Sequence, residues 1–384
     1  MDIKVSSLSQ QPYQASLVRV RYADPNPEGP GVKLENIPSS WEGTYPSREQ
    51  KFFPGSYGRV DSTGSLCRLE DFSALITLWP TRPGSGEQTL ISHQDSTSGW
   101  SLFLDDEGCL AAKLGKAGDT RKFRLEGSLR ERKWYQAWLT YDAQTSKLTL
   151  GKAILDPGLK SEDQTGSSAD YAFESVSQEI PFLIGAQFSG PIDSHFNGKL
   201  EEPKIFSRSL DQQEIEQAFS GKIPDGLLAR WDFSREIPTS RMIDLGPENL
   251  EGYLVNCPAR GMTGSNWNGK EMCWRHAPED YGAIHFHEDD IYDFGWDTDF
   301  TIHLGEDLQS GIYAVKLECE GNEDFIPLFI LPARGKRKAD LCVLVSTFTY
   351  TVYGNHARPD FKDPWRERIR DWNAYPHNPA DFRH

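Results

Sequence analysis

The sequence has little of what would place it in a membrane or on nucleic acid. No apolar stretch approaches the ~20 residues that a membrane-spanning helix needs. The 41 basic residues are outnumbered by 57 acidic ones, and a net charge of −16 argues against nucleic acid or an anionic membrane as a partner. Residues 1–4 lack the basic-then-apolar pattern of a signal peptide, and the six cysteines show no CxxC spacing. We therefore expect a soluble, cytoplasmic protein with buried free thiols.

The chain is poor in methionine, with 4, but rich in the residues that favour β-structure. Aromatic residues make up 12% of the chain, with 33 glycines and 24 prolines. From about residue 72 to residue 206 the sequence reads as short strands separated by polar turns. The clearest predicted strands are 72–79, 89–93, 100–104, 109–114, 134–141 and 147–150. Strands at this spacing, without a long helix among them, predict an antiparallel sandwich.

The order of these pieces resembles the laminin-G/concanavalin A-like jelly roll. The resemblance rests on Trp79-Pro80, 99–104, 134–142, 182–185 and 196–206. We expect this domain to span 66–225. It would be closed by a helix at 211–219, with Ser209 and Gln212 as a capping box. Such sandwiches bind sugars or proteins, or serve as structural modules, so the fold alone does not define a function.

The remaining segments predict three further regions. Residues 1–65 contain an alternating strand at 14–22 and Pro/Gly-rich coil, which we expect to pack on the sandwich. Residues 226–335 alternate like a small β-sandwich-like module. Residues 341–347 form an apolar run followed by a polar, aromatic turn, which predicts the inner parallel strand of an α/β domain beginning near 336. The expected fold is therefore mainly β, followed by the start of an incomplete α/β domain at 336–384.

Two groups of residues are candidate metal ligands. On a strand, His285 and His287 would point to the same face, and Asp290 follows shortly after. Two histidines at this spacing with nearby carboxylates are typical of cupin-type metal sites. The alternative, which we favour, is that these histidines hydrogen-bond the surrounding loops. Asp105 and Asp106 could ligate calcium in the jelly roll, although a solvated hairpin turn is the interpretation we prefer.

Several stretches resemble the large (beta) subunit of N,N-dimethylformamidase. These are 280–296, 310–314, 326–329 and 346–356, and the order of the predicted regions is similar as well. The resemblance covers about 60–384. It implies a hydrolase that cleaves N-substituted formamides to formate and an amine. It also implies that the α/β domain is similar to glutamine amidotransferases and that a small second subunit completes an oligomer.

The resemblance further implies one iron held by two tyrosines and a glutamate. Tyr353, or else Tyr350, matches the first tyrosine ligand, and Asn355 and His356 are candidate substrate-binding residues. Tyrosinate and carboxylate are hard oxygen donors that suit ferric iron. The other two ligands would lie beyond residue 384, so the chain departs from the family by lacking most of the active site. Aromatic packing at a strand end is the alternative role for the two tyrosines.

Two interpretations from different classes of protein follow. In the first, the chain is a subunit, split-gene chain or fragment of a formamidase-like amidohydrolase, inactive alone. Its partners would be a polypeptide carrying the rest of the α/β domain, a small subunit and a small amide substrate, with neither nucleic acid nor membrane involved. In the second, it is a non-catalytic module that binds carbohydrate or protein through the jelly roll. Residues 357–384 discriminate between them, because they are too short for a domain and too aromatic for a tail.

Overall fold

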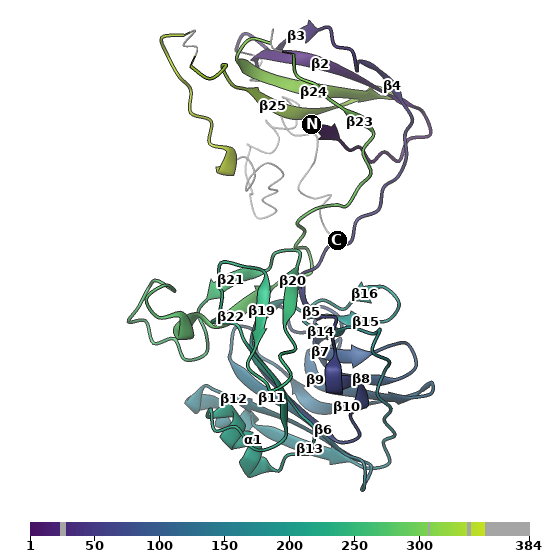
Figure 1. Ribbon diagram of the computed structural model, residues 1–384, viewed down its shortest axis with the longest axis vertical. Helices are drawn as coiled ribbons and strands as arrows, with labels where there is room; N and C mark the ends of the chain where they lie inside the picture. The colour runs from purple at the N-terminus through teal and green to yellow at the C-terminus, as the bar shows by residue number, and fades with distance from the viewer. Residues whose placement is uncertain (24–27, 306–307, 336–338, 350–384) are drawn as a thin grey trace. The chain divides into compact units, whose positions relative to one another are not determined.

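The computed structural model describes residues 1–23, 28–305, 308–335 and 339–349, which fall into two compact units. One unit is Phe53–Phe294, and the other combines residues 1–52 with those from Gly295 onward. Figure 1 shows the strands of both units. None of the helices in the described part of the chain has the length and apolarity that spanning a bilayer requires.

The unit Phe53–Phe294 is the expected jelly-roll sandwich, and it contains a continuous path of antiparallel strands. The first half of the path is β10 (Asp119–Ser128), β9 (Cys109–Lys116), β8 (Gly99–Leu104), β7 (Gln88–Gln94), β14 (Phe182–Ile184), β5 (Tyr57–Val60), β20 (Gly252–Val255) and β19 (Arg241–Asp244). The second half is β18 (Leu227–Asp232), β17 (Gly198–Phe206), β6 (Phe72–Pro80), β11 (Tyr135–Asp142), β12 (Lys147–Ile154) and β13 (Gln164–Ser168). Beside β17 lie β22 (Ala283–Phe286) and, paired with it, β21 (Ala259–Met262).

The two halves face one another across one apolar core, because alternate residues of each strand point inward. Phe72 of β6 stacks on Trp100 of β8 with ring centroids 4.8 Å apart, and Phe182 of β14 stacks on Trp231 of β18 at 4.9 Å. These aromatic pairs tie strands that are not neighbours in the hydrogen-bonded path. The sandwich therefore closes through its core as well as through its edges.

Helix α1 (Gln212–Phe219) packs on the outer face of the second half, where Ile215 joins a cluster with Leu75 and Trp138. The helix forms where the sequence predicts it, but its capping box differs. Asp211 is the N-cap: its side chain accepts a hydrogen bond from the Glu214 amide, and the Glu214 side chain accepts one from the Asp211 amide. The expected pair of Ser209 and Gln212 is therefore not used.

The boundaries of the units differ from those that the sequence suggested. Strands β18 to β22 belong to the jelly roll and not to a separate module, because β18 pairs with β17 and β20 pairs with β5. Strand β2 (Tyr13–Tyr22), expected to pack on the sandwich, instead pairs with β24 (Gly311–Cys319), almost 300 residues further along. Sequence periodicity shows that these strands exist, but it cannot show which distant strands they pair with.

The second unit is built on a sheet in the order β25 (Asn322–Ile330), β24, β2 and β3 (Lys33–Ile37), with β4 (Gly43–Tyr45) on β2. A short pair, β1 (Asp2–Ile3) and β23 (Phe300–Thr301), adds Ile3 and Phe300 to its core. Residues from the first 45 positions and from 300–330 therefore share one hydrophobic cluster.

The predicted α/β strand at 341–347 is not confirmed. Residues 341–346 form no strand, and Leu341, Val343 and Leu344 are exposed, Leu344 at 92%. An inner parallel strand needs a neighbour on each side to satisfy its backbone, and the part of the chain that the structure describes provides none for this run. The six cysteines are free as expected, but the expectation that they are buried is met by Cys109 alone, and Cys257 and Cys342 are exposed.

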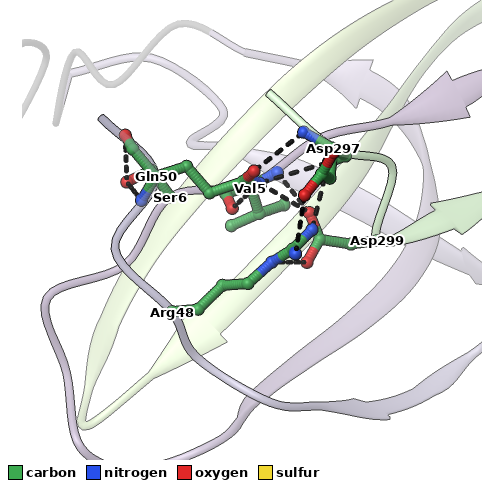
Figure 2. Close-up of polar contacts among 6 residues, drawn as sticks. All are labelled: Val5, Ser6, Arg48, Gln50, Asp297 and Asp299. Atoms are coloured by element: carbon green, nitrogen blue, oxygen red, sulfur yellow. Dashed lines mark hydrogen bonds and ion pairs between the residues drawn. The ribbon is translucent and has the colours of Figure 1, made fainter. Parts of the chain in front are cut away.

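Asp299 links the segment at which the chain leaves the second unit, near residue 50, to the segment at which it re-enters that unit, near residue 297. Its carboxylate, 5% exposed, accepts a 2.7 Å hydrogen bond from the Val5 amide, receives the Gln50 side-chain amide at 3.4 Å and pairs with Arg48 Nε at 3.3 Å. Figure 2 shows these groups converging on one carboxylate. The side chain of the neighbouring Asp297 is 84% exposed, and its Oδ2 makes a longer contact of 3.5 Å with Arg48 Nη1.

Asp299→Ala should lower the free energy of unfolding of this unit by about 2–3 kcal/mol, because the part-buried Val5 amide loses its acceptor and Arg48 loses its carboxylate. Asp297→Ala is the matched control and should cost less than about 1 kcal/mol, since an exposed ion pair contributes little. Hydrogen-exchange mass spectrometry of peptides from β2 and β24 measures both. Equal losses of protection in the two variants would show that the Asp299 contacts are not the important ones.

Candidate functional site

A row of large polar and aromatic side chains crosses the outer face of the sandwich. Lys199 on β17 lies opposite His285 on β22 and opposite Trp79 on β6. The next residue in line is Trp134, which immediately precedes β11, and its ring centroid lies 6.4 Å from that of Trp79. Antiparallel register alone assembles this row, because directly opposed residues of neighbouring strands point to the same face.

Lys199 is a buried cation without a carboxylate hydrogen-bond partner among the described residues. Its side chain is 8% exposed, and its ammonium donates to the carbonyl and hydroxyl oxygens of Thr263 at 3.1 and 2.8 Å. The ammonium also lies 4.8 Å from the ring centroid of Trp79 and 5.8 Å from that of Trp134. Burial lowers the pKa of Lys199 from its ordinary value, partly offset by Glu201.

His285 and His287 point to the same face, as their spacing predicts, with ring centroids 4.1 Å apart. The second ring is oriented by a carboxylate, because its Nδ1 lies 3.2 Å from Asp290 Oδ2, which also accepts a 2.7 Å hydrogen bond from the Ser56 hydroxyl. Nε2 of His285 is buried, and none of the described residues hydrogen-bonds to it. Each histidine therefore occupies a distinct electrostatic environment.

The two pKa values move in opposite directions. Burial lowers the pKa of His285 to about 4, with help from the nearby charges of His287 and Lys199. The hydrogen bond to Asp290 raises the pKa of His287 above its usual value, against a smaller opposing effect of burial. His287 therefore stabilises the fold fully below its unfolded pKa of ~6.5, and this contribution is lost as the pH rises through its folded pKa. His285 acts oppositely, and stability falls as the pH drops from ~6.5 toward about 4.

The two histidines form one wall of a cavity of about 730 Å³. The loop that follows β6 and the loop that precedes β11 supply the other walls. The lining residues are Thr81, Arg82, Pro83, Gly84, Ser85, Ser128, Leu129, Glu131, Arg132, His285 and His287. Arg82 pairs with Glu288, and Arg132 Nε lies 3.1 Å from Glu131. The lining therefore combines two guanidinium groups and two imidazoles with the Glu131 carboxylate and apolar residues such as Leu129.

Neither of the metal sites considered from sequence is supported by the geometry. Among the residues that the structure describes, no group of three or more His, Cys, Asp or Glu side chains could hold a metal ion. The Asp290 carboxylate contacts Nδ1 of His287 and accepts a hydrogen bond from the Ser56 hydroxyl, so it acts as a hydrogen-bond acceptor for these two side chains. In the candidate calcium turn, Asp105 accepts from the amides of Glu107 and Cys109 and pairs with Arg124, which is the solvated turn we favoured.

The candidate residues Tyr350, Tyr353, Asn355 and His356 lie outside the described residues. Conversely, the sequence interpretation missed Lys199, Trp79, Trp134 and Arg132. No local motif marks them, because strand register joins them to the histidines. The available signal in the sequence was a lysine next to an apolar residue of a predicted strand, because Lys199 directly precedes Leu200, which lies in the core.

Comparison with known proteins agrees with this architecture. Residues 54–216 match the family model of the concanavalin A-like lectin/glucanases superfamily, and residues 259–380 match that of N,N-dimethylformamidase beta subunit-like, C-terminal. Among solved structures, a putative carbohydrate binding protein from Bacteroides ovatus covers 66% of this chain and 89% of its own, at 13% identity and a TM-score of 0.39. The family-model match over residues 54–216, together with the strand order, makes the Phe53–Phe294 unit a sandwich of the concanavalin A-like class.

The full-length comparisons are more specific. The N,N-dimethylformamidase beta subunit of Paracoccus aminophilus is 36% identical over 372 residues, covering 89% of this chain and 48% of that protein. The corresponding subunit from Alcaligenes sp is 35% identical over 369 residues, with the same coverage. The chain belongs to the family of N,N-dimethylformamidase beta subunits, and it spans about half the length of these relatives.

Asp290→Asn should lower the pKa of His287, because the substitution removes the carboxylate that favours the protonated ring. The pKa of His285 should stay far below its ordinary value, since its shift comes mainly from burial. Long-range proton–nitrogen NMR spectra of protein labelled with ¹⁵N-histidine, recorded from pH 4 to pH 8, measure both rings. An unaltered His287 titration would show that Asp290 is not its partner in solution.

Proposed function

We propose that this chain is part of an N,N-dimethylformamidase-like amidohydrolase, which cleaves N-substituted formamides to formate and an amine. The supporting observation is the 36% and 35% identity to two beta subunits of that name across 89% of the chain. That similarity involves residues of both compact units, so it is not a likeness of the jelly roll alone. We place the complex in the cytoplasm from the sequence argument.

The reaction requires help at two points. Water must attack the formamide carbonyl carbon, and a poor amine leaving group must then depart with a proton. In our proposal a mononuclear iron, held in the complete enzyme, supplies Lewis-acid polarisation of the carbonyl and a lowered pKa of bound water. The iron ligands would come from the segment around Tyr353 and Tyr350 and from a further polypeptide. A small subunit would complete the oligomer, and Asn355 and His356 would lie beside the substrate.

The sandwich would act in assembly or in binding a second ligand. A non-catalytic module for carbohydrate or protein is the alternative function, and the polar cavity beside His285 is the feature that favours it. The two possibilities differ in whether a native complex containing this chain releases formate.

The purified chain alone should not hydrolyse dimethylformamide, whereas the complex recovered from its host through a tag on this chain should. The reason is that the chain spans only about half the length of the N,N-dimethylformamidase beta subunits that it matches. Formate release, dimethylamine release and iron content measure the difference. Iron-dependent turnover by the chain alone would contradict the split arrangement, and absence of turnover by the native complex would favour the binding module.

Tyr353→Phe should weaken or shift the visible tyrosinate-to-iron absorption band of the native complex. A phenol has an ordinary pKa of ~10, so a phenolate at neutral pH needs a bound cation. Tyr292→Phe is the matched control, because Tyr292 is 79% exposed on the sandwich unit. A normal band with full iron content in Tyr353→Phe would remove this residue from the site and leave Tyr350 as the next candidate.

A further inference from the structure

The cavity beside His285 and His287 offers more hydrogen-bond donors than the surrounding residues use. A guanidinium carries five N–H groups. Arg82 contacts the Glu288 carboxylate, and Arg132 contacts the Glu131 carboxylate through Nε only. Arg132 remains 69% exposed, and neither arginine has another side-chain acceptor in the described part of the chain. Several N–H groups of both therefore remain available to a ligand.

The lining of the cavity carries two arginines, Arg82 and Arg132, and one carboxylate, Glu131. Arg82 is matched by Glu288, Arg132 by Glu131, and His287 by Asp290. Lys199, whose charge reaches His285, has only uncharged hydrogen-bond acceptors within the described residues. The charge of Glu201 partly offsets the burial of Lys199. The part that a negatively charged ligand would complement is therefore the cavity lining, with its two guanidinium groups and one carboxylate.

The walls that carry the two arginines are held by backbone contacts. The carbonyl of Arg82 accepts from the amide and hydroxyl of Ser85 and from the Gln88 side chain, which fixes the turn. Arg132 adopts the left-handed backbone region with φ of 58°, and its amide donates to the Pro80 carbonyl at 2.8 Å. A non-glycine residue in that region is held there by its surroundings. The backbone of each arginine is therefore held in place beside the cavity.

We propose that this cavity binds a small oxyanion, a carboxylate or a phosphate, through the guanidinium groups of Arg132 and Arg82. When His287 is protonated, its Nε2–H adds a further donor, while Nδ1–H of the same ring donates to the Asp290 carboxylate. Arginine suits this task, since its planar N–H groups match two oxygens at once. The proposal concerns the sandwich and does not depend on the amidohydrolase function.

A metal ion fits the same place poorly. A metal needs converging lone pairs, and the described residues supply no group of three potential ligands. The two arginines of the lining offer N–H donors, which an anion accepts, and their charge repels a cation.

Titration of the intact chain with sodium acetate and, separately, inorganic phosphate tests the proposal. Ionic strength is held constant with sodium chloride at pH 7. The His287 and His285 ring signals of ¹⁵N-histidine-labelled protein should shift and saturate, with a dissociation constant on the order of 1 mM for a small probe. Saturation by acetate alone assigns a carboxylate, and saturation by phosphate alone assigns a phosphate. Shifts that chloride reproduces in full would overturn the proposal.

Arg132→Gln should weaken binding about tenfold, because it removes a charge-assisted hydrogen bond. Arg130→Gln is the matched control: Arg130 lies on the same loop but pairs with Glu162 at 2.6 Å, away from the cavity lining. Far-UV circular dichroism confirms folding, and Arg82→Gln, which should also weaken binding, replaces Arg132→Gln if that variant unfolds. Equal affinity in the cavity variant and the Arg130 control would overturn the proposal.

Discussion

The register of β17 is the constraint on which the core and the cavity both depend. This strand pairs with β6 on one side and, on the other, first with β22 and then with β18. Leu200 points into the core, so its neighbour Lys199 must point outward. A slip of one residue would bury the lysine in the apolar core and expose the leucine. The packing of the core therefore fixes the row of Lys199, Trp79 and His285 as well.

A bulge in the same strand lets it serve two different surfaces. The register shifts between Glu201 and Lys204, and Glu202 adopts a left-handed φ of 46°. After the shift, Ile205 faces the core while Lys204 lies under helix α1, near the ring of Phe219. The outer face of one strand thus meets the polar row at one end and an apolar helix at the other. Helix α1 covers one end of the outer face of β17, and the cavity lined by His285 and His287 lies toward the other end.

Local patterns were enough to predict the sandwich, its hairpins and its helix. The turn at Asp105 and the helix starting near Asp211 depend on residues within a few positions of each other. The pairing of β5 with β20 and of β2 with β24 depends on residues about 200 and 300 positions apart. Nothing in a local pattern encodes such a partner, so the region after 226 was assigned to a separate module. The apolar run at 341–345 misled the prediction for a related reason: an inner strand is defined by its neighbours.

The site follows the same division between local and distant information. A period of two correctly placed His285 and His287 on one face, but it could not show that Asp290 would orient one ring while burial isolates the other. Opposite pKa shifts of two imidazoles in contact mean that the pair takes up its first proton on His287. Asp290 also accepts a hydrogen bond from Ser56, which lies 234 residues earlier in the chain and immediately precedes β5. The protonated ring of His287 is therefore linked through Asp290 to the start of that strand. The histidine pair thus joins the cavity wall to the strand that opens the sandwich, and its charge state acts on the fold and on the cavity together.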